Sequence, residues 1–331
     1  MVNKMSIQLC HELTETNGKM EFAYLGAKAW HGLGQEIPVG ATVEETQRAA
    51  GMAWRIERAP VQYGVLSNAG GFPLPELHEA PGRVVLYRSD TLAPLSVVSS
   101  RFNEVQPVQA LEFFRDMVEA GGYVLETAGT MRGGARLFAT VRPAQAFELP
   151  GGDLVEGRLL FATACDGSMA TTVRQVSIRV VCKNTLGAAI GGSPDCVTVR
   201  HSSKINPVAM KEKLRTVSGT FDAFRCAAEV LAKSSVSASR AADFLSMLLP
   251  DPRVGLVEDT KGYKKMLALF NGEGLGASGL SSAGTAWGLL NAVTQYVDHE
   301  VGARNPENRQ DSAIFGSGAV LKSRALALLT N

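Results

Sequence analysis

Short segments in which apolar and polar residues alternate predict that the first 200 positions are rich in β-strands. Met52, Trp54 and Ile56 alternate with more polar neighbours, and Val61 and Val65 continue that period of two. Turn-forming residues separate further segments of this kind, and the Asp-Gly pair at position 166 is a strong hairpin signal. The predicted hairpins pair residues 83–88 with 94–100, 123–129 with 135–143, and 158–164 with 169–176, and residues 197–202 form a last short strand.

Helical periodicity marks the later part of the chain. Asn206 is a suitable helix N-cap and Pro207 a suitable first residue. From Met210 to Leu231, apolar residues recur at alternating spacings of four and three, which predicts a helix about 40 Å long with a heptad seam. The other predicted helices begin after the capping box Thr42–Glu45, at Pro107, and near residues 238, 260, 285 and 315.

This order of elements predicts an α+β fold with an antiparallel sheet core, an inserted helix and a helical C-terminal third. Residues 1–25 lack a sustained pattern and are expected to form a flexible N-terminal arm. Residues 26–205 are expected to form the sheet core, and residues 206–331 a helical region packed on it. The Gly/Pro-rich residues 67–82 predict a loop.

The middle of the chain carries an excess of positive charge. Residues 131–233 carry 14 Lys and Arg against 8 Asp and Glu, and from Gly167 to Lys211 the only carboxylate is Asp195. The stretch 173–187 is predicted to begin as a strand and to become helical near Arg179. Such a cationic segment can face a polyanion.

An electropositive groove for nucleic acid is therefore expected in this region. Spaced cations suit a phosphate backbone, since each neutralised phosphate releases counterions. A solvated face, or pairing with acids of the N-terminal third, is the alternative. The residues predicted to line the groove are Arg132, Arg136, Arg174, Arg179, Lys183, Arg200 and Lys204.

The sequence offers weaker support for enzymes or cofactors. No P-loop or dinucleotide fingerprint is present, and the five scattered cysteines form no CxxC pair, so no cofactor and no metal are expected. No apolar run is long enough for a membrane span, and a cytoplasmic location is expected. Cys182 and His201 would be the candidates for a cysteine-dependent enzyme, which ranks last.

Several blocks of sequence occur in an order that resembles the phage/plasmid-like protein family built on domain of unknown function 932. They are "WHGLG", "AGMAWRIE", "RVVLYRSDT", "VVSSRFNEVQP", "CDGS", "RVVCKNTLGAAI", "VRHS" and "WGLLNAVTQYVDHE" with "SAIFGSGAVLKSRAL". The chain departs from that pattern at Ala164-Cys165, where a Ser-His pair is expected, and at Lys183, where Gln is common.

The resemblance implies a home on phages, plasmids or integrative elements. A more distant similarity, in the order of elements, is to single-strand annealing recombinases of the Redβ/RecT type. It implies an oligomeric protein that binds single-stranded DNA and promotes annealing in homologous recombination, without catalytic residues. The expected partners are single-stranded DNA, further copies in a ring or filament, and an exonuclease of the same element. The competing hypothesis is a mobile-element inhibitor of host defence that binds an acidic protein.

Overall fold

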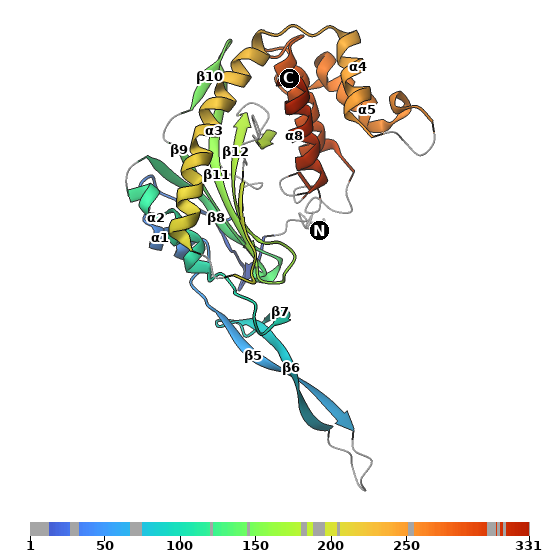
Figure 1. The fold of residues 1–331 in the computed structure, drawn as a ribbon. Helices are drawn as coiled ribbons and strands as arrows, with labels where there is room; N and C mark the ends of the chain where they lie inside the picture. Colours follow the sequence, from blue (N-terminus) through green and yellow to red (C-terminus); the bar gives the residue numbers. More distant parts are fainter. Residues whose placement is uncertain are drawn as a thin grey trace, which may run out of the picture.

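A computed structural model gives the fold (Figure 1). It describes residues 13–26, 33–66, 75–119, 122–143, 146–179, 184–187, 196–203, 206–250, 255–302, 309, 312–313 and 316–330. Antiparallel sheets are combined with helices that gather in the C-terminal third, so the predicted α+β class is confirmed.

The centre of the molecule is a sheet with nine strands among the described residues. These strands are β3 (Phe22–Leu25), β4 (Gln35–Ile37), β8 (Tyr123–Met131), β9 (Arg136–Pro143), β10 (Phe147–Leu149), β11 (Asp153–Ala164), β12 (Thr171–Arg179), β13 (Asn184–Gly187) and β14 (Cys196–Val199). Their order is β13-β12-β11-β9-β8-β3-β4, with β10 beside β11 and β14 beside β12. Every pair is antiparallel except β3 with β4, and the predicted hairpins β8–β9 and β11–β12 are confirmed.

One face of this sheet packs on α1 (Val43–Ala49) and α2 (Pro107–Glu119). Alternation along β9 directs Leu137 and Val141 to this face, where they share a core with Phe114 of α2. Both helices were predicted. The capping box is present at α1, and α2 begins at its proline.

The N-terminal segment differs from the flexible arm predicted for residues 1–25. Short strands β1 (Glu15–Thr16) and β2 (Lys19–Met20) precede β3, and β3 pairs with β8. Phe22 of β3 is fully buried and lies against Phe138 on the second face of the sheet. Packing against distant residues fixes this segment, which no local pattern could predict. Residues 1–12 lie outside the described part.

A second, three-stranded sheet lies beyond one end of the central sheet (Figure 1). It contains β5 (Ile56–Leu66), β6 (Pro75–Arg88) and β7 (Pro94–Ser99). β7 pairs only with residues 83–87, so residues 61–66 and 75–82 form a two-stranded ribbon that projects from the body; we call it the arm. The loop predicted for 67–82 is thus a strand from Pro75 onward. Proline is tolerated there because an edge needs no further N–H donor.

The C-terminal third is helical, as predicted. Its helices are α3 (Pro207–Lys233), α4 (Ala238–Leu248), α5 (Lys261–Ala268), α6 (Ala286–Gln295) and α8 (Ser317–Thr330). Asn206 caps α3 as predicted, its Oδ1 accepting a hydrogen bond from Ala209 N at 3.1 Å. None of the helices in the described ranges is long and apolar enough to cross a membrane.

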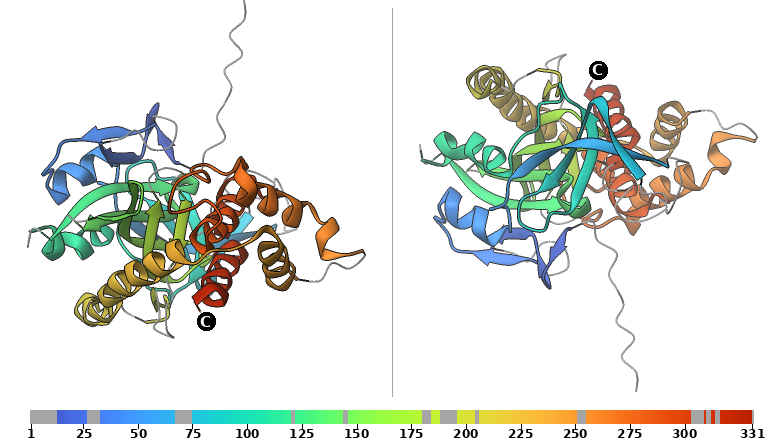
Figure 2. Two further views of the ribbon diagram at one scale, coloured as in Figure 1. Left: turned by 90° about the horizontal axis from the view of Figure 1, so that it is seen from above. Right: turned by 90° about the horizontal axis from the view of Figure 1, so that it is seen from below.

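A second hydrophobic core joins these helices to the sheet. Phe224 and Leu231 of the predicted seam are buried in it beside Trp287, together with Val155 of β11. Asp153 adds a polar connection, because its Oδ2 accepts from Trp287 Nε1 at 3.0 Å. Seen along the sheet, α6 and α8 lie beyond the β13 edge, while β4 and α1 lie at the other edge (Figure 2).

The helix predicted from Arg179 onward is wrong for the residues that the structure describes there. β12 continues through Arg179, which is opposite Asn184 of β13, and Val176 is opposite Gly187. The chain remains extended because β11 pairs with β12 from Val155 to Ala162.

Candidate nucleic-acid interface

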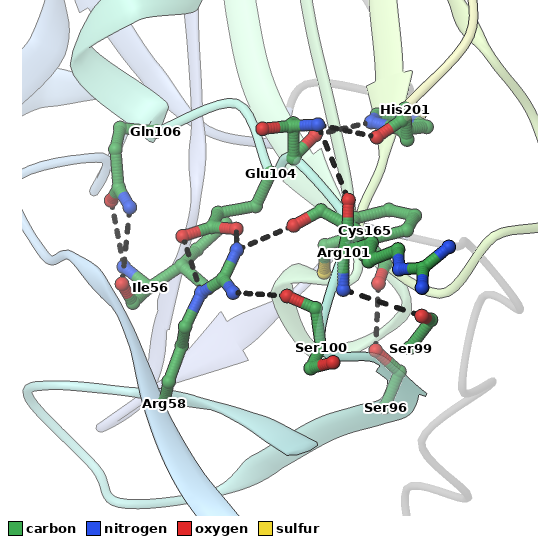
Figure 3. A network of polar contacts seen from close by, with 12 residues as sticks. Ile56, Arg58, Ser96, Ser99, Ser100, Arg101, Glu104, Gln106, Cys165 and His201 are labelled. Carbon is green, nitrogen blue, oxygen red and sulfur yellow. Dashed lines mark hydrogen bonds and ion pairs between the residues drawn. The ribbon is translucent and has the colours of Figure 1, made fainter. Parts of the chain in front are cut away.

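Four loops meet at the end of the central sheet that is nearest to β7, and Figure 3 shows contacts made by three of them. Cys165 N donates to Ala135 O at 2.9 Å, which connects the β11–β12 turn to the β8–β9 hairpin. His201 Nε2 lies 3.2 Å from Met169 O, which connects the end of β14 to the same turn. Asn103 N donates to His201 O at 2.7 Å and adds the segment between β7 and α2. Residues 99–106, 131–136, 165–170 and 200–203 are therefore one connected group of loops.

Arg58 of β5 holds the segment between β7 and α2 in shape. Its Nε donates to Glu104 Oε1 at 3.1 Å, and its Nη2 donates to the other carboxylate oxygen. The same guanidinium donates to Ser100 O at 3.3 Å and to Phe102 O at 2.5 Å. The hydrogen bond to Glu104 raises the pKa of Arg58. These contacts neutralise Glu104 and give Arg58 a structural role.

Two further contacts fix this segment. The side-chain amide of Gln106 accepts from Ile56 N at 2.8 Å and donates to Ile56 O at 3.0 Å, in the manner of an additional strand. The Phe102 ring stacks on His201 with centroids 4.4 Å apart. Residues from β5, from the segment before α2 and from the end of β14 thus hold one another in place.

His201 is a structural link in this group of loops. It is buried, and its ring nitrogens lie 2.8 Å from Asn103 O and 3.2 Å from Met169 O. Both ring nitrogens thus lie at hydrogen-bonding distance from backbone carbonyl oxygens, which gives the imidazole a structural role. Cys182, the other candidate for a cysteine-dependent enzyme, lies outside the described residues. Within the described ranges, no group of three or more His, Cys, Asp or Glu could hold a metal ion.

Cys165 is expected to resist alkylation in the native protein. Its thiol is buried and donates to Ala135 O at 3.4 Å. Burial, with a smaller contribution from Asp166, raises the pKa of the Cys165 thiol to about 12, so little thiolate forms near neutral pH. Peptide mass spectrometry after iodoacetamide at pH 8 should find Cys165 unmodified and the exposed Cys226 modified. Equal labelling of the two would contradict this expectation.

Exposed arginines project from three of the four loops. They are Arg101, Arg132 at the tip of the β8–β9 hairpin, and Arg200 after β14. Asn103 Nδ2 lies 3.3 Å from Arg101 O and 3.0 Å from His201 O, so the loops that carry Arg101 and Arg200 are in direct contact. We call Arg101, Arg132 and Arg200 the basic end.

The acids of these loops are already engaged. Glu104 is bound by Arg58, and Asp166 Oδ1 accepts from Ser168 N at 2.8 Å. Guanidinium groups beside hydroxyl donors are the usual protein ligands of phosphate. The exposed hydroxyl residues next to the arginines are Ser99, Ser100, Ser202 and Ser203.

The family model described as "Domain of unknown function (DUF932)" matches residues 94–314, about two thirds of the chain. The chain belongs to the DUF932 family. The matched range begins at β7, after the arm, and contains all four loops of the basic end. Searches of curated proteins and of solved structures each returned no match.

All seven residues predicted for the groove lie within the DUF932 range, and the structure separates those of them that it describes. Arg132 and Arg200 are exposed at the basic end. Arg136 is only 8% exposed, and its Nη2 donates to Ser168 Oγ at 3.4 Å, so it lies beneath the surface. Lys183 and Lys204 lie outside the described residues.

The remaining two predicted residues, Arg174 and Arg179, belong to β12, which runs away from the basic end. Arg136 is opposite Ala164 and Arg179 is opposite Val155, nine residues apart along β11 and hence separated by about 30 Å. Arg174 is half-buried between these positions. The described residues do not line one continuous groove as expected, because the arginines of β12 are spread along the length of the sheet. The candidate interface of this DUF932 protein is therefore narrower than predicted.

Sequence reasoning missed Arg101. An arginine three residues before Glu104 gives no charge signal of its own. The Asn103–His201 contact, which brings its loop against the loop of Arg200, joins residues about one hundred positions apart. The order of the blocks "VVSSRFNEVQP", "CDGS" and "VRHS" was the available signal. The structure brings all three blocks together at the basic end.

A buried ion pair supports the hairpin tip that carries Arg132. Arg88 Nη2 lies 2.5 Å from Glu21 Oε1, and Arg88 Nη1 lies 3.1 Å from Glu21 Oε2. The Arg88 guanidinium also lies 4.2 Å from the centre of the Trp54 ring. A Cβ at Gly134 would lie only 2.9 Å from the Trp54 ring, and the φ of +98° at this residue also favours glycine. Glycine therefore allows the hairpin tip to pack directly on Trp54 and Arg88.

Proposed function

We propose that this protein binds single-stranded DNA through the basic end, associates with further copies of itself, and promotes strand annealing in homologous recombination without a catalytic residue. The same proposal places it in the cytoplasm as a protein of phages, plasmids or related elements, similar in activity to the Redβ/RecT type. An exonuclease of the same element is the proposed enzymatic partner. The ordered sequence blocks support this context, and the chemistry of the basic end supports the ligand.

The observation that carries the proposal is the exposure of Arg101, Arg132 and Arg200 on loops that hydrogen bond to one another. Arginine binds phosphate oxygens with paired N–H donors, and a charged hydrogen bond is about twice as strong as a neutral one. The four loops contain four arginines and two acids, and one of these acids, Glu104, is paired with Arg58 of β5, so the loops carry an excess of positive charge.

Phosphate contacts also suit annealing. Contacts to the backbone fix the register of a strand and read no sequence, so the base edges of a bound strand stay free to pair. A protein that acts in this way needs well-placed cations and no reacting group. The structural roles of His201 and Cys165 are consistent with such a protein.

Replacing all three arginines is expected to weaken DNA binding at least about tenfold, because three charge-assisted contacts are lost. We would measure the fluorescence anisotropy of a labelled oligothymidylate with the wild type and with the variant R101Q/R132Q/R200Q. The matched control is Arg240→Gln, an exposed arginine on α4 at the other end of the molecule.

Two results would contradict the proposal. One is a loss of binding free energy in Arg240→Gln that reaches a third of the loss in the triple variant. Since the control removes one charge and the variant three, that result would indicate binding through general charge. The other is an absence of oligonucleotide binding by the wild type. If the wild type binds an acidic protein instead, and the triple variant does not, the competing hypothesis of a host-defence inhibitor would be favoured.

A further inference from the structure

The ring of His201 has a carbonyl oxygen opposite each of its nitrogens. Nδ1 lies 2.8 Å from Asn103 O, and Nε2 lies 3.2 Å from Met169 O. A carbonyl oxygen accepts hydrogen bonds and donates none, so a ring nitrogen must carry a hydrogen in order to bond it. Neutral imidazole has one N–H and imidazolium has two. Only the protonated ring can therefore make both hydrogen bonds.

Burial of His201 increases the importance of the second hydrogen bond. The residue is 8% exposed, so water has little access to a nitrogen or a carbonyl oxygen that lacks a partner. A buried polar group without a partner is destabilising. The shorter contact is at Nδ1, which we assign as the N–H of the neutral ring. A proton taken up from solvent is then added at Nε2, which faces Met169 O.

Opposing charges surround the ring. The ionisable groups on the described segments that pack against His201, 99–106, 165–170 and 200–203, are Arg101, Glu104, Cys165, Asp166 and Arg200. Glu104 is bound by Arg58, and the Cys165 thiol is protonated near neutral pH. Burial and the two arginines oppose a positive charge on the ring, whereas the carbonyl oxygens and the Phe102 ring, stacked 4.4 Å away, favour it. An added negative charge nearby can therefore decide the protonation state.

A phosphate bound at the basic end supplies that negative charge. Arg200 is the residue before His201, and Arg101 is two residues before Asn103, whose carbonyl oxygen faces the ring. A phosphate held by these arginines therefore lies near the imidazole and favours its protonated form. The protonated ring in turn connects residues 99–106 to the β11–β12 turn, and so holds the loops of the basic end together.

We propose that binding of single-stranded DNA at the basic end is coupled to protonation of His201, so that the protein takes up a proton when it binds and binds more tightly at lower pH. The inference rests on the proposed function and names a regulation of the same site. The coupling is reciprocal, because protonation raises the affinity for DNA by the factor by which DNA raises the affinity for the proton. Imidazole ordinarily changes its charge between pH 5 and 8, which sets the range of the effect.

Isothermal titration calorimetry counts the protons without any change to the protein. The full chain is titrated with an oligothymidylate that lacks terminal phosphates, at pH 7 and constant salt, in buffers with different heats of ionisation. Thymine and phosphodiester groups keep their charge in this range, so any proton taken up belongs to the protein. We expect uptake of up to about one proton per site, and an affinity at least about threefold higher at pH 6 than at pH 8.

Two variants assign the proton to His201. His201→Gln should abolish the uptake and flatten the pH dependence, since an amide does not titrate in this range. The matched control H11Q/H31Q/H78Q/H299Q removes the other four histidines of the chain and should retain the uptake of the wild type. This control leaves His201 unchanged, so it also tests the inference if His201→Gln fails to fold.

The outcomes separate this inference from the proposed function. Binding of the oligothymidylate without proton uptake overturns the inference alone, as does wild-type uptake in His201→Gln or a loss of uptake in the folded control variant. An absence of binding by the wild type at every pH overturns the proposed function, and the inference with it.

Discussion

Glu21→Gln is expected to lower the free energy of unfolding by about 3–5 kcal/mol, because it leaves Arg88 as a buried charge with one fewer counter-ion. The side chains of Arg88 and Glu21 are 2% and 4% exposed. Glu21 also accepts hydrogen bonds from Thr16 and Thr130. Asp90 remains as a second acid, with its Oδ2 2.8 Å from Arg88 Nη2. Urea denaturation followed by tryptophan fluorescence measures the loss.

Two further variants make this prediction specific. Glu21→Leu combined with Arg88→Met removes both charges, and we expect it to recover much of the lost stability. Arg55→Gln removes an exposed arginine that pairs with Glu57 at 3.2 Å, and it should cost at most about 1 kcal/mol. If Glu21→Gln cost no more than Arg55→Gln, the ion pair would not support the hairpin tip in the way proposed.

Asp298→Asn is expected to have an effect of similar size at the other end of the fold. Lys322 of α8 is 2% exposed, and its Nζ lies 2.6 Å from Asp298 Oδ1. Burial lowers the pKa of Lys322, while the Asp298 carboxylate opposes that shift. Without this carboxylate, the buried ammonium loses the counter-charge that Asp298 provides, at a cost of about 3–5 kcal/mol. Thermal and urea unfolding of the single variant and of D298N/K322M measure the loss and its recovery.

The pH dependence of the stability of Asp298→Asn tests the direction of the pKa shift of Lys322. A lysine whose pKa is lowered in the folded state binds fewer protons there than in the unfolded chain. Stability therefore rises with pH between the lowered pKa of Lys322 and its ordinary value of about 10.5. Without the Asp298 carboxylate the pKa of Lys322 is lowered further, so we expect the rise to begin at a lower pH and to be larger in total in Asp298→Asn than in the wild type. A rise that begins at the same pH in both proteins would contradict the role given to Asp298.

Elements with strong local signals could be predicted from the sequence. Helix α2 begins at a proline, α3 has an asparagine cap followed by a proline, and the β11–β12 turn contains Asp-Gly. Each signal fixes the backbone of its own residues, so no knowledge of distant neighbours is needed. The α+β class followed from the order of these elements.

Elements that depend on distant partners could not be predicted. β13 is a strand because β12 offers it an edge, and residues 13–25 are ordered by contacts with β8 and Arg88. Residues 75–82 contain two prolines and a glycine, which predict a loop, yet pairing with β5 draws most of them into a ribbon. In each case tertiary contacts decide against the local preference.

In the candidate site, too, local features could be predicted from the sequence and distant contacts could not. Its net charge was visible in the sequence, and Arg132 and Arg200 were named from it. The burial of each side chain could not be predicted from the sequence. Arg132 and Arg136 lie only four residues apart, yet Arg132 is exposed and Arg136 is buried. Contacts between loops, above all Asn103 with His201, decide which of the arginine-bearing loops lie together.

The salt dependence of DNA binding is the decisive test of phosphate binding at the basic end. On single strands, each phosphate contact contributes about 0.7 to the slope of log affinity against log salt concentration. If Arg101, Arg132 and Arg200 each contact a phosphate, the slope for R101Q/R132Q/R200Q should be shallower than that of the wild type by about 2. Slopes that are equal for the wild type, the triple variant and Arg240→Gln would contradict phosphate binding at the basic end.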